Sequence, residues 1–222
     1  MSIKQSLLEI KNSLPETVTL VAVSKTKPVS DLEEAYAAGQ RIFGENKIQE
    51  MTQKWEVMPK DIQWHMIGHV QTNKVKYMAE YVSLIHGVDS LKLLKEINKQ
   101  AKKYNRVINC LLQMHIAEES TKFGLDLEEL NSLVSSDVFK TLENIKVVGL
   151  MGMATFTDNQ NQVKKEFGTL KEVFSSLQST KSTNLDVKIL SMGMSGDYKI
   201  AIDQGSTMVR IGSSIFGSRN YI

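Results

Sequence analysis

Eight short, mostly apolar runs recur along this chain of 222 residues, and helical segments separate them. The runs occupy residues 19–25, 41–45, 63–68, 82–88, 108–116, 146–154, 186–192 and 207–212. They are too short for helices and do not alternate cleanly between polar and apolar residues, which is the pattern of strands buried on both faces. Strands of this kind that alternate with helices predict parallel βαβ units.

Apolar residues recur at helical spacing in several segments between these runs. The clearest stripes consist of Ile3, Leu7, Ile10 and Leu14, of Leu94, Ile97, Ala101 and Tyr104, and of Val163, Phe167, Leu170, Phe174 and Leu177. Capping signals agree with the helices: Ser30 and Glu33 predict a capping box, and Gly39 marks the end of that helix. Asp126 and Glu129 predict a second capping box.

Eight such units in 222 residues predict a single (β/α)8 TIM barrel of the α/β class, with one extra helix before its first strand. Neither a linker nor a low-complexity segment divides the chain, so residues 1–222 are expected to form one domain. An open, doubly wound sheet is the alternative, because it is built from the same local units.

Charge and cysteine content narrow the classes of partner and compartment. With 27 Lys and Arg against 25 Asp and Glu, the formal net charge is +2, which gives no electrostatic case for nucleic acid or an anionic membrane. The one cysteine, Cys110, cannot form an intrachain disulfide and fits a reducing cytoplasm. The first 14 residues are amphipathic rather than a secretion signal, and no apolar stretch approaches the ~20 residues of a membrane span. We therefore expect a cytoplasmic protein.

Polar residues gather where the predicted strands end, which is the end of an α/β fold that carries its chemistry. At the first strand, Val21, Val23 and Lys25 share one face, so Lys25 follows apolar residues into the interior. Desolvation and the neighbouring charge of Lys27 are expected to lower the pKa of Lys25. A neutral amine is a nucleophile that forms a Schiff base with an aldehyde or ketone. The alternative is a lysine that extends to the rim and only solvates the strand end.

Two further motifs follow the last two strands. Residues 192–197 (Met-Gly-Met-Ser-Gly-Asp) form a glycine-containing turn before a helix, where backbone N–H groups and the Ser195 hydroxyl make an anion site. Residues 210–214 (Arg-Ile-Gly-Ser-Ser) supply Arg210, and Gly212 permits a ligand to approach the backbone. The loops after the seventh and eighth strands are the usual phosphate site of this barrel. An ordinary turn and a rim salt bridge are the alternatives.

An amine nucleophile, a phosphate site and a cation at one end of the fold suit a phosphorylated carbonyl compound. Pyridoxal 5′-phosphate and a sugar phosphate both meet this description. The four histidines at positions 65, 69, 86 and 115 match no metal motif and have no cysteine cluster beside them, so no metal site is expected. The sequence also lacks the glycine-rich motifs for ATP or dinucleotides.

The sequence resembles the pyridoxal phosphate homeostasis proteins, which are single-domain relatives of the alanine racemase N-terminal barrel. The similar motifs are residues 22–28 (AVSKTKP), 43–46 (FGEN), 64–69 (WHMIGH), 71–74 (QTNK), 119–124 (ESTKFG), 192–195 (MGMS) and 209–212 (VRIG). They occur in order from about residue 18 to the C-terminus, and this co-occurrence makes the resemblance specific.

The resemblance implies a barrel that holds pyridoxal phosphate as a Schiff base on Lys25. It also implies that Arg210 faces the pyridine nitrogen and that Lys122 takes part in cofactor exchange. Ser195 and the residues around Gly212 would hold the phosphate. The full set of expected cofactor-binding residues is Lys25, Asn46, Met192, Ser195, Arg210, Gly212, Ser213 and Lys122.

These residues favour a carrier over an enzyme. Arg210 beside the ring nitrogen would leave that nitrogen unprotonated and the ring a weak electron sink. In alanine racemases a tyrosine from a second domain supplies the opposing acid or base, and we expect that domain to be absent because this chain ends at Ile222, directly after the last strand. We expect storage and delivery of pyridoxal phosphate in vitamin B6 homeostasis, with apo-enzymes as transient partners and no certain catalytic residue. The alternatives are an amino-acid racemase-like enzyme and a class I aldolase that uses Lys25 without a cofactor.

Overall fold

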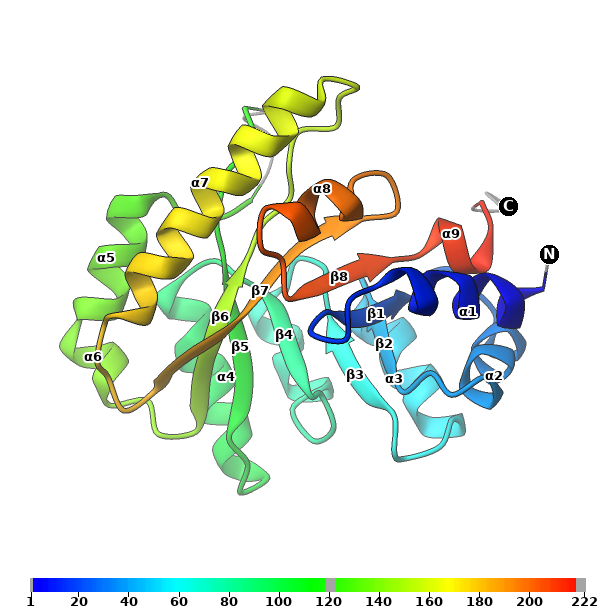
Figure 1. Ribbon diagram of the computed structural model, residues 1–222. Coiled ribbons are helices and arrows are strands. Elements are labelled where there is room, and N and C mark those ends of the chain that lie inside the picture. The colour runs from blue at the N-terminus through cyan, green and yellow to red at the C-terminus, as the bar shows by residue number, and fades with distance from the viewer. Residues whose placement is uncertain (1, 119–122, 219–222) are drawn as a thin grey trace.

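The computed structural model describes residues 2–118 and 123–218 of the chain. Eight parallel strands close into one barrel in sequence order, and helices surround it (Figure 1). The strands are β1 (Thr19–Val23), β2 (Ile42–Glu45), β3 (Gln63–Met66), β4 (Leu84–Val88), β5 (Ile108–Gln113), β6 (Ile145–Met151), β7 (Leu185–Met194) and β8 (Met208–Ile211). The expected (β/α)8 barrel is confirmed, and the open-sheet alternative is wrong, because β1 pairs with β8.

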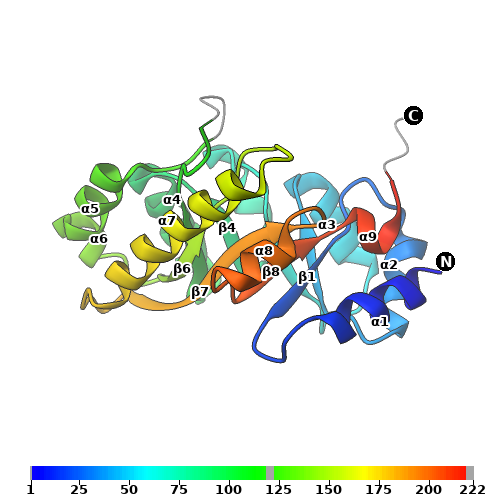
Figure 2. The same cartoon turned by 45° about the horizontal axis from the view of Figure 1, so that its top comes forward.

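The outer layer consists of helices that follow the strands. They are α1 (Ile3–Ser13), α2 (Val29–Ala37), α3 (Ile48–Val57), the 3₁₀ helix η1 (Thr72–Tyr77), α4 (Leu91–Lys103), α5 (Leu127–Ser135), α6 (Asp137–Lys140), α7 (Gln160–Gln178), α8 (Tyr198–Asp203) and α9 (Ser213–Phe216). The extra N-terminal helix is α1, which packs beside α2 and α9 (Figures 1 and 2). The first and last helices therefore meet beside the junction of β1 with β8.

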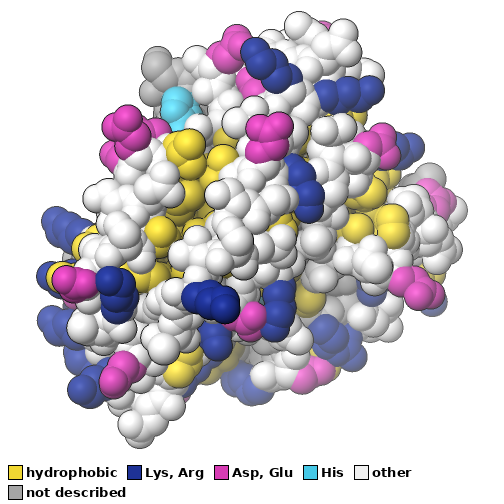
Figure 3. All heavy atoms as spheres, turned by 60° about the vertical axis from the view of Figure 1, so that its left-hand side comes forward, with side chains coloured by type: hydrophobic (Ala, Val, Ile, Leu, Met, Phe, Trp, Pro, Cys, Tyr) yellow, Lys and Arg dark blue, Asp and Glu magenta, His cyan; other side chains and the backbone are white. Residues whose placement is uncertain are grey.

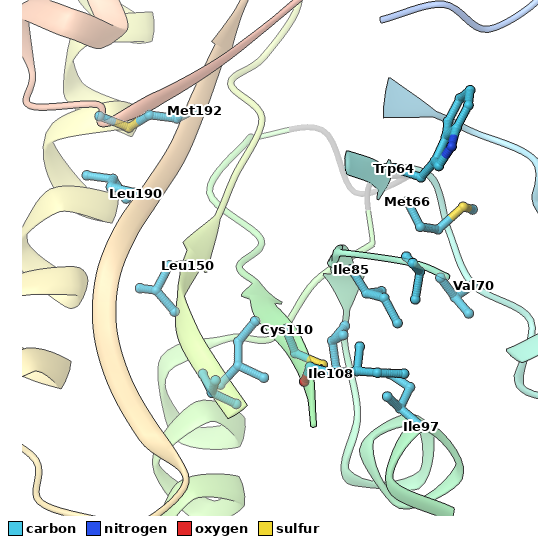
Figure 4. Packing of buried hydrophobic residues seen from close by; sticks show 14 of the residues in the cluster. Trp64, Met66, Val70, Ile85, Ile97, Ile108, Cys110, Leu150, Leu190 and Met192 are labelled. Carbon is cyan, nitrogen blue, oxygen red and sulfur yellow. Dashed lines mark hydrogen bonds between the residues drawn. The ribbon is translucent and has the colours of Figure 1, made fainter. Parts of the chain in front are cut away.

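Strand side chains divide between two apolar layers because successive residues point to opposite faces. One cluster is drawn from strands alone, so it fills the lumen; its buried members are Val21, Leu84, Leu111, Val148, Met151 and Met208. The other lies between strands and helices, where Ile85 of β4 and Cys110 of β5 pack near Ile97 of α4 (Figure 4). Because side chains fill the lumen, a ligand has room only toward the strand ends.

Helix starts test the two predicted capping boxes. The box at Asp126 is confirmed: its carboxylate accepts from the Glu129 N–H at 2.8 Å, and the Glu129 carboxylate accepts from the Asp126 N–H at 3.0 Å. The box predicted at Ser30 is wrong. Helix α2 already begins at Val29 after the extended residue Pro28, so Ser30 lies inside the first turn instead of before it.

The surface carries both signs of charge. On the face shown in Figure 3, Lys and Arg side chains are interspersed with Asp and Glu, and hydrophobic side chains gather between them. This mixture agrees with the small net charge of +2. Within the described residues, no helix has both the length and the apolar character to cross a membrane.

Candidate functional site

Lys25 lies half-buried in the turn that joins β1 to α2. Val21 of the same strand belongs to the lumen layer, so the two-residue alternation carries Lys25 toward that side. The next residue, Thr26, has a φ of 63°, a left-handed conformation that is unusual for a β-branched residue. Such a conformation persists only where neighbouring groups hold it in place.

A buried group of charges outside the barrel holds this turn; we call it the Lys54 cluster. The Lys54 ammonium on α3 donates to the Ser24 carbonyl at 2.8 Å, to Glu45 Oε1 at 2.8 Å and to Glu50 Oε1 at 2.7 Å. Glu50 Oε1 also accepts from the Thr26 backbone N–H at 2.6 Å, and the Ser24 hydroxyl donates to Glu45 Oε1 at 2.6 Å. The cluster therefore contacts the backbone on both sides of the intervening lysine.

Two other lysines near this turn are occupied by hydrogen bonds. An ammonium has three protons, and Lys54 has an acceptor for each. Lys27 Nζ donates to the carbonyls of Phe216 at 2.6 Å and Ser218 at 3.0 Å, which ties the turn to the end of α9. Neither amine is placed to act as a nucleophile. The nucleophilic role of Lys25 stays a prediction.

Glu45→Gln is expected to remove part of the pH dependence of stability. Burial raises the pKa of Glu45 to about 6, although Lys54 and then Ser24 oppose the shift, and Oε2 has no hydrogen-bond partner among the described residues. The folded protein thus binds this proton more tightly than the unfolded chain, so ionisation destabilises the fold as the pH rises from about 4.5 through 6.

The measurement is chemical unfolding of wild type and Glu45→Gln at pH 4.5 and pH 7. Relative to wild type, the variant should gain up to about 2 kcal/mol of unfolding free energy at the higher pH. A stability difference that stays constant between the two pH values would contradict the elevated pKa of Glu45.

The loops after β7 and β8 bring backbone donors together. The Ser195 hydroxyl accepts from the Gly212 N–H at 3.2 Å, which joins the two loops. Within the described residues, the amides of Ser195, Gly196, Ser213 and Ser214 have no acceptor. Unpaired amides beside a hydroxyl, in the loops that lead into two short helices, make a donor set that suits a phosphate.

Arg210 lies buried in β8, directly before the second of these loops. Its Nη1 donates to the Ser191 carbonyl at 2.9 Å and hydroxyl at 2.7 Å, and its Nη2 donates to the Gly152 carbonyl at 3.1 Å. The ion pairs of the described residues do not include Arg210, so the rim salt bridge considered from sequence is not found. Burial lowers the pKa of Arg210 to about 10, opposed by the charge of Asp197. Arg210 is therefore a cation at neutral pH, held by neutral groups.

Three predicted cofactor-binding residues remain, and they do not all lie at the strand ends. Asn46 follows β2 and is half-buried at the same end of the barrel. Met192 belongs to the outer apolar layer together with Leu190 (Figure 4), so its side chain lies on the helix side of β7 rather than in the lumen. Lys122 lies outside the described residues.

The sequence prediction omits Ser191, Lys54 and Glu50. Ser191 interrupts an apolar run, and its alternation with Ile189, which packs on the lumen layer, is a signal that identifies it as a lumen residue. Lys54 and Glu50 are four residues apart on one helix, a spacing typical of exposed ion pairs. No sequence signal distinguishes this buried pair from an exposed one.

Comparison with known proteins places this barrel in one family. Residues 2–220 match the family model of the alanine racemase N-terminal domain. A pyridoxal phosphate homeostasis protein of Aquifex aeolicus is 40% identical over 203 residues, which are 91% of this chain and 87% of that protein. One of Haemophilus influenzae is 38% identical over 214 residues, which are 95% and 89% of the two chains.

A solved structure agrees with this family assignment. PipY of Synechococcus elongatus, with pyridoxal phosphate bound, superposes with a TM-score of 0.88 at 33% identity and covers 97% of this chain and 100% of its own. The chain therefore belongs to the pyridoxal phosphate homeostasis protein family, and its barrel is an alanine racemase N-terminal domain.

Proposed function

We propose that this chain binds pyridoxal 5′-phosphate through Lys25 and carries the cofactor inside the cell, for storage and delivery in vitamin B6 homeostasis. One observation carries the proposal: a lysine after β1, unpaired amides after β7 and β8, and the buried cation of Arg210 meet at one end of the barrel. The homeostasis proteins and PipY, with its bound pyridoxal phosphate, support the same ligand.

The residues fit each part of this cofactor. The bound cofactor supplies an aldehyde that condenses with a lysine amine. The Ser195 hydroxyl and the amides around Gly212 and Ser213 suit the phosphate. Arg210 is charged at neutral pH and can only donate hydrogen bonds, so it suits the lone pair of the ring nitrogen. Asn46 lies at the end of β2, where we place it beside the ring.

The same residues favour a carrier over a strong catalyst. A donor on the ring nitrogen keeps that nitrogen unprotonated, which limits how much negative charge the ring accepts. The histidines closest to Arg210 in the lumen are poor proton acceptors, because burial lowers the pKa of His65 to about 3 and that of His86 well below its ordinary value. Delivery to apo-enzymes, in which we give Lys122 a role in exchange, completes the proposal.

The test of covalent binding is the mass of the protein after incubation with pyridoxal phosphate and reduction with borohydride. We expect one added cofactor per chain, located by peptide mapping on Lys25. A sugar phosphate that gives the only borohydride-trapped adduct would favour an aldolase instead, and that adduct would have no visible absorbance.

Ser195→Ala and Gly212→Val are expected to weaken cofactor retention. Ser195→Ala removes one hydrogen bond to an anion, worth roughly 1.5–3 kcal/mol, or about ten- to one-hundred-fold in affinity. Gly212→Val should do more, because even a Cβ at this position would lie 3.1 Å from the Val23 carbonyl oxygen and would push on the end of β1. Equilibrium dialysis measures retention, and circular dichroism verifies that each variant is folded. Equal retention by wild type and both variants would refute the phosphate assignment.

The carrier role has its own test. The loaded protein is mixed with an apo-transaminase, and recovered transaminase activity is followed beside a chiral assay of the protein alone. We expect transfer of the cofactor and no racemisation at an ordinary enzymatic rate of ~1 s⁻¹ or more. Racemisation at that rate would favour the racemase-like alternative.

A further inference from the structure

Four buried polar side chains form a continuous hydrogen-bonded chain across the lumen. Arg210 Nη1 donates to Ser191 Oγ at 2.7 Å, and Ser191 Oγ lies 3.1 Å from His86 Nδ1. His86 Nε2 lies 3.1 Å from His65 Nδ1. The chain thus connects β8 through β7 and β4 to β3, and all four residues are at most 4% exposed.

The direction of these hydrogen bonds follows from Arg210, which can only donate. Ser191 Oγ accepts from the guanidinium and has one proton to give, and His86 Nδ1 is its neighbour. His86 then carries its proton on Nε2 and donates it to His65 Nδ1. The opposite direction would make Ser191 accept twice and would leave its buried proton without an acceptor among the described residues, at a cost of about 1–3 kcal/mol.

His65 is therefore neutral with its proton on Nε2. Desolvation lowers the pKa of His65 to about 3. The pKa of His86 is lowered as well, first by desolvation and then by electrostatic interaction with His65 and Arg210. Neither ring takes a second proton at neutral pH. Because Nδ1 of His65 is occupied as an acceptor, its Nε2–H is the end of the chain and is left to donate to a further group.

The order of the strands indicates which ligand atom lies nearest to His65. In the pyridoxal ring, the carbons that bear the phosphate arm, the aldehyde and the hydroxyl are consecutive. The corresponding protein groups follow one another around the barrel: the amides after β7 and β8 come first, then Lys25 after β1. The hydroxyl, on the far side of the aldehyde, would then face β2 and β3. The ring nitrogen is across the ring from the aldehyde and would face Arg210, which contacts Gly152 and Ser191.

We propose that His65 is a binding residue that donates its Nε2–H to the phenolic oxygen on carbon 3 of the pyridoxal ring, and that His86 and Ser191 are positioning residues that keep this nitrogen protonated. The inference rests on the proposed function, because it concerns how the same cofactor is recognised. It assigns the lumen histidines to recognition of the ring and not to proton abstraction.

The experiment compares pyridoxal 5′-phosphate with its 3-deoxy analogue, which lacks the phenolic oxygen. Dissociation constants for both compounds are measured by equilibrium dialysis with the full chain, and the ratio of the two constants is compared between variants. A difference in reactivity between the two compounds affects wild type and variants alike, so it cancels when the ratios are compared. We expect His65→Phe to reduce the wild-type preference for the hydroxyl-bearing compound about ten- to one-hundred-fold.

Three further variants separate this role from a structural one. His65→Gln, which retains an N–H donor, should recover part of the preference. Ser191→Ala should reduce the preference although Ser191 does not contact His65. If His65→Phe does not fold, the Ser191→Ala result decides whether the inference holds. His69→Phe, at an exposed histidine beyond the end of β3, should leave the ratio unchanged.

The outcomes distinguish this inference from the proposal on which it rests. Wild-type binding of pyridoxal phosphate with the same ratio in wild type, His65→Phe and Ser191→Ala overturns the assignment of His65 and leaves the carrier proposal intact. Failure of the wild type to bind pyridoxal phosphate at all overturns both.

Discussion

Lys25→Ala is expected to abolish the covalent adduct with pyridoxal phosphate and the visible absorbance that accompanies it. Alanine has no amine, and the two lysines that the structure shows bonded around this turn are occupied: Lys54 donates to three acceptors and Lys27 to two carbonyls. The measurement is the absorbance spectrum of the dialysed protein, together with its mass after borohydride reduction. The expected change is complete loss of both signals, with the barrel still folded.

Two further variants test whether the adduct requires the amine of Lys25 itself. Lys25→Arg keeps a positive charge but removes the nucleophile, so it should lose the adduct as completely as alanine does. Lys27→Ala is the matched control, because it removes a lysine from the same turn whose Nζ is bonded to the carbonyls of Phe216 and Ser218. It should keep the adduct. An adduct that persists in Lys25→Ala would mean that another lysine is the anchor, and Lys122 is the first to examine.

The fold and the grouping of the site were accessible from sequence for a physical reason. Strands buried on both faces are short apolar runs, and a parallel barrel brings all their C-terminal ends to one side. Any polar residue at such an end is therefore near the others, even without knowledge of strand order. This is why Lys25, Ser195 and Arg210 were placed together, and the structure confirms that the strands carrying them are neighbours.

Side-chain direction along β7 follows simple alternation only up to the irregular end of the strand. The pairing of β7 with β8 shifts register between Ser191 and Met194, and Gly193 has a φ of 96°. From Ile189 to Met192 the alternation holds, and it places Ser191 in the lumen beside Arg210 and Met192 in the outer layer. Met192 is among the predicted residues because it belongs to the motif at residues 192–195, and Ser191 lies just outside that motif.

The Lys54 cluster could not be predicted from the sequence, for a different reason. Its contacts join residues that are 4, 9 and 30 positions apart, and the last of these depends on how α3 packs against the β1–α2 turn. A lysine on an amphipathic helix is usually exposed, and only the closed barrel shows that this one is 5% exposed. Buried charge is a property of tertiary packing that local patterns do not record.

Lys54→Met is expected to lower the free energy of unfolding by about 3–5 kcal/mol, because it leaves Glu45 and Glu50 buried or partly buried without their cation. The Ser24 carbonyl loses its donor in the same step. Denaturant unfolding measures the change. Lys95→Met, at an exposed lysine on α4, is the matched control and should change stability by less than about 0.5 kcal/mol.

The Lys54 variant also tests whether the cluster positions Lys25 or only stabilises the barrel. Combining Lys54→Met with Glu45→Gln removes the most buried of the two orphaned carboxylates, so part of the lost stability should return. The turn, however, remains without the ammonium that connects Ser24 to Glu50, and Glu50 is the group that accepts from Thr26 in its strained conformation. We therefore expect the double variant to recover stability but to form the Lys25 adduct more slowly than wild type. Recovery of both stability and adduct formation would mean that the cluster serves folding alone.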